Sequence, residues 1–115
     1  MHLNVQLAGV GAFDDAGVVR AVWAGAETSE PLARLQRACD SAARRAGLKP
    51  ERRTWNPHVT LAYLKGADAA QVGVWVRDHN LIRPPAFRAR SFGLYSSLRS
   101  GGGSTYRLER LYPLA

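Results

Sequence analysis

The pattern of apolar and polar positions predicts two strands in the N-terminal quarter of the chain. Residues 3–8 alternate between apolar and polar, as in a half-buried strand, and Gly9-Val10-Gly11 predicts a bend or bulge directly after it. Asp14-Asp15-Ala16-Gly17 is typical of a turn. Residues 18–26 are more continuously apolar, so we expect this second strand to lie in the interior of its sheet.

A helical pattern follows. Thr28, Ser29 or Glu30 ahead of Pro31 predicts the start of a helix that runs to about Ala46, with Gly47 as the residue just beyond its end. Its apolar side chains fall on one stripe: Leu32, Leu35, Cys39, Ala42 and Ala46. The stripe predicts that Cys39 is a small buried core residue. The arginines off the stripe are expected to form a solvated face: Arg34, Arg37, Arg44 and Arg45.

The middle of the chain predicts one strand and one short helix. Asn56-Pro57 restricts the backbone to an extended conformation and leads into a strand from His58 to Leu64. Asp68, with Gln71 three residues later, resembles a capping box that starts a helix ending near His79.

The C-terminal part predicts a hairpin. Strands from Phe87 to Ser97 and from Thr105 to Tyr112 are joined by a glycine-rich segment, residues 100–104, which we expect to be a flexible hairpin tip. The predicted order is therefore β, β, α, β, α, β, β. This order indicates an α+β fold in which two helices can pack on one face of a mainly antiparallel sheet, with residues 1–115 as a single domain.

Composition and charge narrow the function classes only partly. A chain of 115 residues with 46% hydrophobic residues is long enough for one compact domain. It has no apolar run near the ~20 residues that span a bilayer, so we expect a cytoplasmic protein that does not bind membranes. The net charge of +7 favours an anionic partner such as nucleic acid. Because nearly all of this charge is arginine, a GC-rich genome explains it equally well.

Of the three histidines, only His58 has neighbours that suggest a chemical role. His2 lies beside the start of the chain and His79 near a predicted helix end. The strand period of two places His58 and Thr60 on the same face. A histidine can exchange a proton near neutral pH and a threonine can donate a hydrogen bond to a phosphate oxygen, so the pair can hold a phosphoryl group. A structural histidine at this spacing is also common.

The residues around His58 resemble a known family. Pro57-His58-Val59-Thr60-Leu61-Ala62 is similar to the second His-x-Thr-Leu motif of the two-histidine (2H) phosphoesterase superfamily, specifically the 2′-5′ RNA ligase-like RNA 2′,3′-cyclic phosphodiesterases. Further strings resemble the same family in the same order: Leu7 to Phe13 its "GVGxF" strand, Val22 to Gly25 its "WAG" strand, and Ser104 to Tyr106 with Leu111 to Leu114 its C-terminal hairpin.

This resemblance implies a fold and a reaction. The fold is bilobal, with two related α/β repeats that each contribute one His-x-Thr strand to a central cleft, and the chain corresponds to about one repeat plus one extra N-terminal strand. One histidine acts as the general base on water and the other as the general acid on the leaving 3′-oxygen of an RNA or nucleotide 2′,3′-cyclic phosphate, which leaves a 2′-phosphate. By resemblance His58 is one of these histidines and Thr60 binds the phosphate. No metal or nucleotide cofactor is implied.

The chain departs from the family pattern in two ways. The first His-x-Thr motif belongs to an N-terminal stretch that these residues do not contain, and Tyr63 stands where members often carry an arginine. Nearby arginines, Arg52, Arg53 or Arg99, are candidates to compensate. Loss of one acid/base partner typically costs about 10²–10⁴ in rate, so a monomer of this chain should be weak or inactive.

Three explanations of the missing motif stay open. The start codon is assigned too far downstream, or the chain is a catalytically weak or inactive RNA- or nucleotide-binding remnant, or a homodimer brings two copies of His58 together. An unrelated α+β domain with a structural His58 is the remaining alternative.

Overall fold

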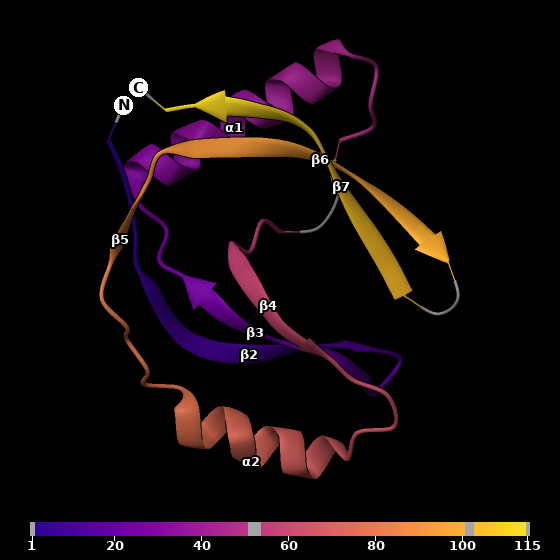
Figure 1. Ribbon diagram of the computed structural model, residues 1–115. Coiled ribbons are helices and arrows are strands. Elements are labelled where there is room, and N and C mark those ends of the chain that lie inside the picture. The colour runs from indigo at the N-terminus through magenta and orange to yellow at the C-terminus, as the bar shows by residue number, and fades with distance from the viewer. Residues whose placement is uncertain (1, 51–53, 101–102, 115) are drawn as a thin grey trace. The chain divides into compact units, whose positions relative to one another are not determined.

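The computed structural model of the protein describes residues 2–50, 54–100 and 103–114, and these form two helices and seven strands (Figure 1). In chain order the elements are β1 (Leu3–Val5), β2 (Leu7–Asp15), β3 (Val18–Ala26), α1 (Glu30–Arg45), β4 (His58–Tyr63), α2 (Ala69–His79), β5 (Phe87–Ala89), β6 (Ser91–Ser100) and β7 (Gly103–Pro113). The fold is α+β with antiparallel sheets, as predicted.

The chain divides into two compact units. One consists of Val5–Phe87 and the other of Met1–Asn4 with Arg88–Ala115. The strands form three sheets, β1-β5, β2-β3-β4 and β6-β7, where the sequence predicted one main sheet. The assignment of residues 1–115 to a single partial domain stays a prediction.

The three-stranded sheet β2-β3-β4 is the framework of the first unit. Its central strand β3 carries the buried side chains of Val19, Ala21, Val22 and Ala24, which confirms that the apolar second strand is interior. Asp15 pairs with Val18 across a two-residue turn of Ala16 and Gly17, whose φ angles are 52° and 81°. Positive φ at both central residues is typical of a type I′ hairpin turn, which matches the twist of paired strands.

The glycine-containing bend predicted near residue 9 is a bulge. The pairing of β2 with β3 shifts between Leu7 and Val10, and Gly9 between them has a φ of 73°, a conformation that favours glycine. The predicted strand 3–8 is interrupted at Gln6, because β1 pairs with β5 whereas β2 pairs with β3 and continues to Asp15.

Both helices begin and end on the signals that the sequence carries. Ser29 caps α1 by accepting a hydrogen bond from the Leu32 N–H, and Gly47 follows its end with a φ of 89°. Asp68 caps α2, and its carboxylate accepts from the Ala70 N–H at 2.9 Å. Among the described residues, no helix is long and apolar enough to cross a membrane.

The two helices differ in how they are packed. α2 packs against β2 and β3, whereas α1 lies apart from α2 (Figure 1), and neither helix has a fully buried residue. The prediction that both helices cover one face of a sheet is therefore wrong for α1. Cys39, predicted to be a core residue, is exposed, because no helix or strand in the described ranges buries this part of the helix.

The arginines of α1 form the predicted solvated face. Arg34, Arg37, Arg44 and Arg45 are all exposed. Arg37 pairs with Glu30 at 3.1 Å, and Arg44 pairs with Asp40 at 2.9 Å. Exposed pairs of this kind contribute little to stability, so these residues mainly keep that face of the helix in water.

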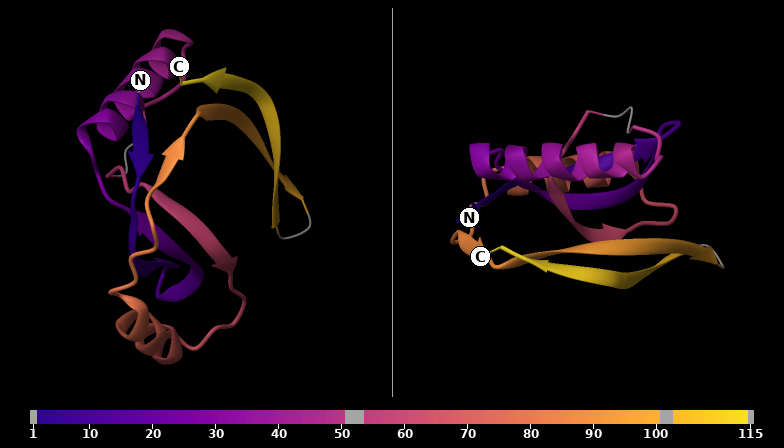
Figure 2. Two further views of the ribbon diagram at one scale, coloured as in Figure 1. Left: turned by 60° about the vertical axis from the view of Figure 1, so that its left-hand side comes forward. Right: turned by 90° about the horizontal axis from the view of Figure 1, so that it is seen from above.

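The second unit is built around the predicted C-terminal hairpin. β6 and β7 pair antiparallel from Ser91↔Pro113 to Ser100↔Gly103, and the hairpin curves along its length (Figure 2). The rings of Phe92 and Tyr112 stack with centroids 5.0 Å apart. The predicted strand 87–97 is two strands, β5 and β6, and residues 101–102 of the predicted flexible tip lie outside the described residues.

Candidate functional site

β4 carries the two residues that the sequence singles out. It begins at His58, directly after Pro57, and pairs antiparallel with β3. His58 lies opposite Gly25 and Thr60 opposite Trp23, whereas Val59 lies opposite Ala24 in the alternating position. Since neighbours on one strand alternate between faces, His58 and Thr60 share one face of the sheet, and their side chains are adjacent on it.

The imidazole of His58 is held by a backbone hydrogen bond. Its Nδ1 lies 2.6 Å from the carbonyl oxygen of Asn56, two residues earlier in the chain. A carbonyl can only accept, so Nδ1 carries the proton and donates it. Nε2 is then the ring nitrogen that can accept a proton from a substrate or from water.

Both side chains can be reached by a ligand. His58 is exposed and Thr60 is half-buried. The hydroxyl of Thr60 is held on a paired strand two residues from the imidazole. The arrangement offers a proton-transfer group and a hydrogen-bond donor on one accessible surface, which suits an oxyanion such as a phosphate.

Two aromatic rings surround His58, and they come from the two other strands of the sheet. The ring of Phe13 on β2 meets the imidazole edge-on, with centroids 4.9 Å apart. The indole of Trp23 on β3 lies 6.0 Å from the imidazole and 5.5 Å from Phe13. Sequence reasoning did not place Phe13 or Trp23 in the site, although both lie in strings that resemble the family.

Tyr63 is brought onto the same face by a bulge in β4. The pairing with β3 shifts between Val22, opposite Ala62, and Trp23, opposite Thr60, so Leu61 is the extra residue. Beyond this bulge Tyr63 pairs with Ala21, which on its other side pairs with Phe13. Tyr63 therefore shares the face of Phe13 and Trp23.

The compensation of Tyr63 by nearby arginines stays a prediction. Arg52 and Arg53 lie outside the described residues. Arg99 lies on β6, in the other unit.

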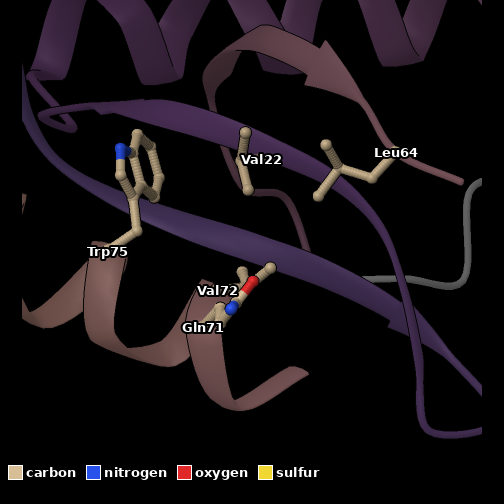
Figure 3. Close-up of a pocket in the computed structure, with 5 residues that line it drawn as sticks. All are labelled: Val22, Leu64, Gln71, Val72 and Trp75. Carbon is tan, nitrogen blue, oxygen red and sulfur yellow. The ribbon is translucent and has the colours of Figure 1, made fainter. Parts of the chain in front are cut away.

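A cavity of about 260 Å³ lies on the side of the sheet that faces α2 (Figure 3). It is lined by Val22, Leu64, Gln71, Val72 and Trp75, and none of these side chains can act as an acid or base near neutral pH. Val22 precedes Trp23 on β3 and points to the opposite face. The cavity is therefore separate from the surface that carries His58.

The fold and the site together indicate a class of protein. A histidine and a threonine two residues apart on an exposed strand face, within an antiparallel α+β framework, are typical of phosphoesterases that hold phosphate with a His-x-Thr strand. The family model described as "LigT like Phosphoesterase" matches residues 22–106, which include β4 and both site residues. The chain belongs to the LigT-like phosphoesterase family, within the 2H phosphoesterase superfamily.

A solved structure shares the fold. The chain is similar to the crystal structure of TT0787 of Thermus thermophilus, with a TM-score of 0.70 and 20% sequence identity. The match covers 98% of this chain and 61% of that one. The chain thus spans less than two thirds of the length of the structure it resembles. No curated protein matches the sequence.

Proposed function

We propose that the protein takes part in the hydrolysis of 2′,3′-cyclic phosphate ends of RNA or nucleotides, with His58 as one of two acid/base histidines. The observation that carries the proposal is the imidazole of His58, whose Nδ1 donates to the Asn56 carbonyl while its Nε2 shares an exposed sheet face with Thr60. Membership of the LigT-like phosphoesterase family supports phosphoester chemistry at this strand.

The proposed reaction needs two proton transfers. A base removes a proton from water as its oxygen attacks phosphorus, and an acid gives a proton to the 3′-oxygen as the P–O3′ bond breaks, so that the phosphate remains on the 2′-oxygen. In its neutral form, with Nδ1 protonated, His58 can be the base through Nε2; in its protonated form it can be the acid.

The neighbours of His58 on this face bind the phosphate in the proposal. The Thr60 hydroxyl donates a hydrogen bond to a non-bridging phosphate oxygen and holds the phosphorus near Nε2. Tyr63, on the same face, can hydrogen-bond to an oxygen but brings no positive charge. In the proposal, hydrogen bonds from this face meet the negative charge that develops on the phosphate.

The second histidine must come from elsewhere. In the proposal it is supplied by sequence outside these residues or by a second copy, since neither His2 nor His79 is part of a His-x-Thr motif. A chain that keeps the phosphate site but lacks the second histidine in solution would bind the cyclic phosphate without turning it over.

Replacement of His58 tests the proposal directly. His58→Ala should lower hydrolysis of a 2′,3′-cyclic nucleotide by about 10²-fold or more, because one proton transfer loses its catalyst. His79→Ala is the matched control: His79 is also exposed and its Nδ1 also bonds a backbone carbonyl, that of Trp75, but it lies on α2. Formation of the 2′-phosphate by the purified chain and both variants is the measurement.

The outcomes separate the alternatives. Turnover that is lost in His58→Ala and kept in His79→Ala supports the acid/base role. Equal turnover in all three proteins would remove His58 from the mechanism. Binding of the cyclic nucleotide without any 2′-phosphate, at every protein concentration, would identify a binding module in place of an enzyme.

A further inference from the structure

The indole of Trp23 lies over Gly11 of the neighbouring strand β2. A Cβ atom on Gly11 would come within 2.3 Å of Cζ2 and 2.4 Å of Cη2 of Trp23. A Cβ on Gly25 would meet the backbone oxygen of Ala8 first, at 3.0 Å, and would be in ordinary contact with the indole at 3.4 Å. Because Gly11 does not have a positive φ, what it provides here is space for the indole.

The indole and Phe13 together form a wall beside the imidazole of His58. Centroid separations of 5.5 Å between Phe13 and Trp23, 4.9 Å between Phe13 and His58, and 6.0 Å between Trp23 and His58 all fall in the range of interacting aromatic rings. The interplanar angle of 78° between Phe13 and His58 is an edge-to-face arrangement, which depends on ring orientation and not only on apolar contact.

The imidazole of His58 is also held by the carbonyl oxygen of Asn56, which lies 2.6 Å from its Nδ1. A directed hydrogen bond and two ring contacts together restrict the rotamers available to this side chain. Since the imidazole is otherwise exposed on an edge strand, it would sample other rotamers without the rings.

We infer that Phe13 and Trp23 are positioning residues that keep His58 in one rotamer and one tautomer, and that Gly11 is a glycine because the indole needs its space. The expected effect of these residues on turnover rests on the proposed function. The orientation of the imidazole itself does not depend on that function.

Phe13→Leu is the main test, with the full chain. Phe13 is 38% exposed, so a leucine there keeps the strand apolar and leaves the buried core untouched. The ring-proton and ring-nitrogen NMR signals of His58, assigned by their loss in His58→Ala, should shift, and the Nδ1-protonated tautomer should lose population. Turnover of the cyclic nucleotide should fall by about 10- to 100-fold in kcat with little change in KM. Phe13→Tyr should restore both.

Gly11→Ala is the second test, and Gly73→Ala is its matched control. The added methyl on Gly11 must displace the indole, whereas a Cβ on Gly73, on the helix α2, meets nothing within 4 Å. Gly11→Ala should shift the His58 signals and lower kcat, and Gly73→Ala should change neither.

These measurements distinguish failure of this inference from failure of the proposed function. Unchanged His58 signals in Phe13→Leu would overturn the positioning role, whatever the activity. Shifted signals in a chain with no turnover would uphold the positioning role and count against the proposed function. Shifted His58 signals with an unchanged kcat would overturn the claim that the orientation of His58 matters for turnover.

Discussion

The role of the Thr60 hydroxyl can be tested by a conservative substitution. Valine has nearly the shape of threonine and suits a strand, but it has no hydroxyl to donate to a phosphate. Because hydrogen bonds to charged groups contribute roughly 1.5–3 kcal/mol, Thr60→Val should lower kcat/KM for a cyclic nucleotide by roughly 10- to 100-fold.

Thr60→Ser is the matched control, since it keeps the hydroxyl and removes only a methyl group. It should stay near the activity of the unmodified chain when both variants are assayed side by side for 2′-phosphate formation. If Thr60→Val were as active as Thr60→Ser, the hydroxyl would not contact the phosphate in the rate-limiting transition state.

The sequence predicts that His58 and Thr60 share a face, but it does not predict which side chains surround them. Their common face follows from the period of two along a single strand, which is a local property. The contacts with Phe13 and Trp23 depend on the register between three strands, and a bulge on either side of β3 shifts that register. The sequence does show that Gly11 and Phe13 share a face of one strand, and Trp23 and Gly25 a face of the next. It cannot show that the two rings lie beside His58, because that depends on how the three strands pair.

One ion pair joins two elements far apart in the sequence. Glu27, directly after β3, pairs with Arg83, between α2 and β5, through both carboxylate oxygens. Gln6 and Gly9 bind the same connecting segment through the backbone oxygens of Pro84 and Ile82. These bonds tie the segment after α2 to the first strands of the unit.

Glu27→Gln should therefore change the pH dependence of stability. The hydrogen bond from Arg83, opposed by a smaller effect of burial and aided by the positive charge of Arg83, holds the pKa of the Glu27 carboxyl below its usual value of 4.5. A lowered folded-state pKa stabilises the fold above the unfolded-state pKa, and that contribution is lost as the pH falls through the folded value. The pKa of Arg83 is raised, so the arginine stays charged throughout this range.

Urea unfolding at pH 7 and pH 3 is the measurement. Glu27→Gln should lower stability slightly at pH 7 and by less at pH 3, with the difference reduced by salt, because both side chains are exposed. Glu109→Gln is the control, since its partner Arg107 lies on the same strand, two residues away. A deficit of equal size at both pH values would show that the pair does not contribute as an ion pair.

Helices and hairpins were predicted well because their signals are local. Ser29 and Asp68 start the two helices through their own neighbours, and Gly47 follows α1 as expected. What the sequence did not predict depends on distant packing. Cys39 lies on an apolar stripe, yet a stripe predicts burial only when another element covers it.

At the scale of the whole molecule, much apolar surface is exposed. β4 is an edge strand, and Val59 and Leu61 on it are about half exposed, at 47% and 52%. The two-stranded sheet β6-β7 exposes further large apolar side chains: Leu94, Tyr95, Leu98, Tyr106, Leu108 and Leu111. Two-stranded hairpins are marginally stable alone, and apolar patches of this kind usually mark interfaces.

A second copy of the chain is one partner that would cover such surface and also supply a second His58. We expect the purified chain to form a dimer of twice its 12.6 kDa, measured by gel filtration with light scattering. A strictly monomeric chain at working concentration would exclude this source of the second histidine and leave sequence beyond the chain as the alternative.

Mixing experiments then show whether both copies of His58 serve one site. When the unmodified chain and His58→Ala are unfolded together in equal amounts and refolded, only dimers with two histidines should be active, so turnover falls to about one quarter of that of the unmodified chain at the same total protein concentration. A fall to about one half would mean that each chain acts independently of the other's His58. An equal mixture with His79→Ala should keep full turnover, because His79 lies on α2, away from the face of Thr60. Dimerisation with one-quarter turnover would show that two copies of a single His-x-Thr strand complete one phosphoesterase site.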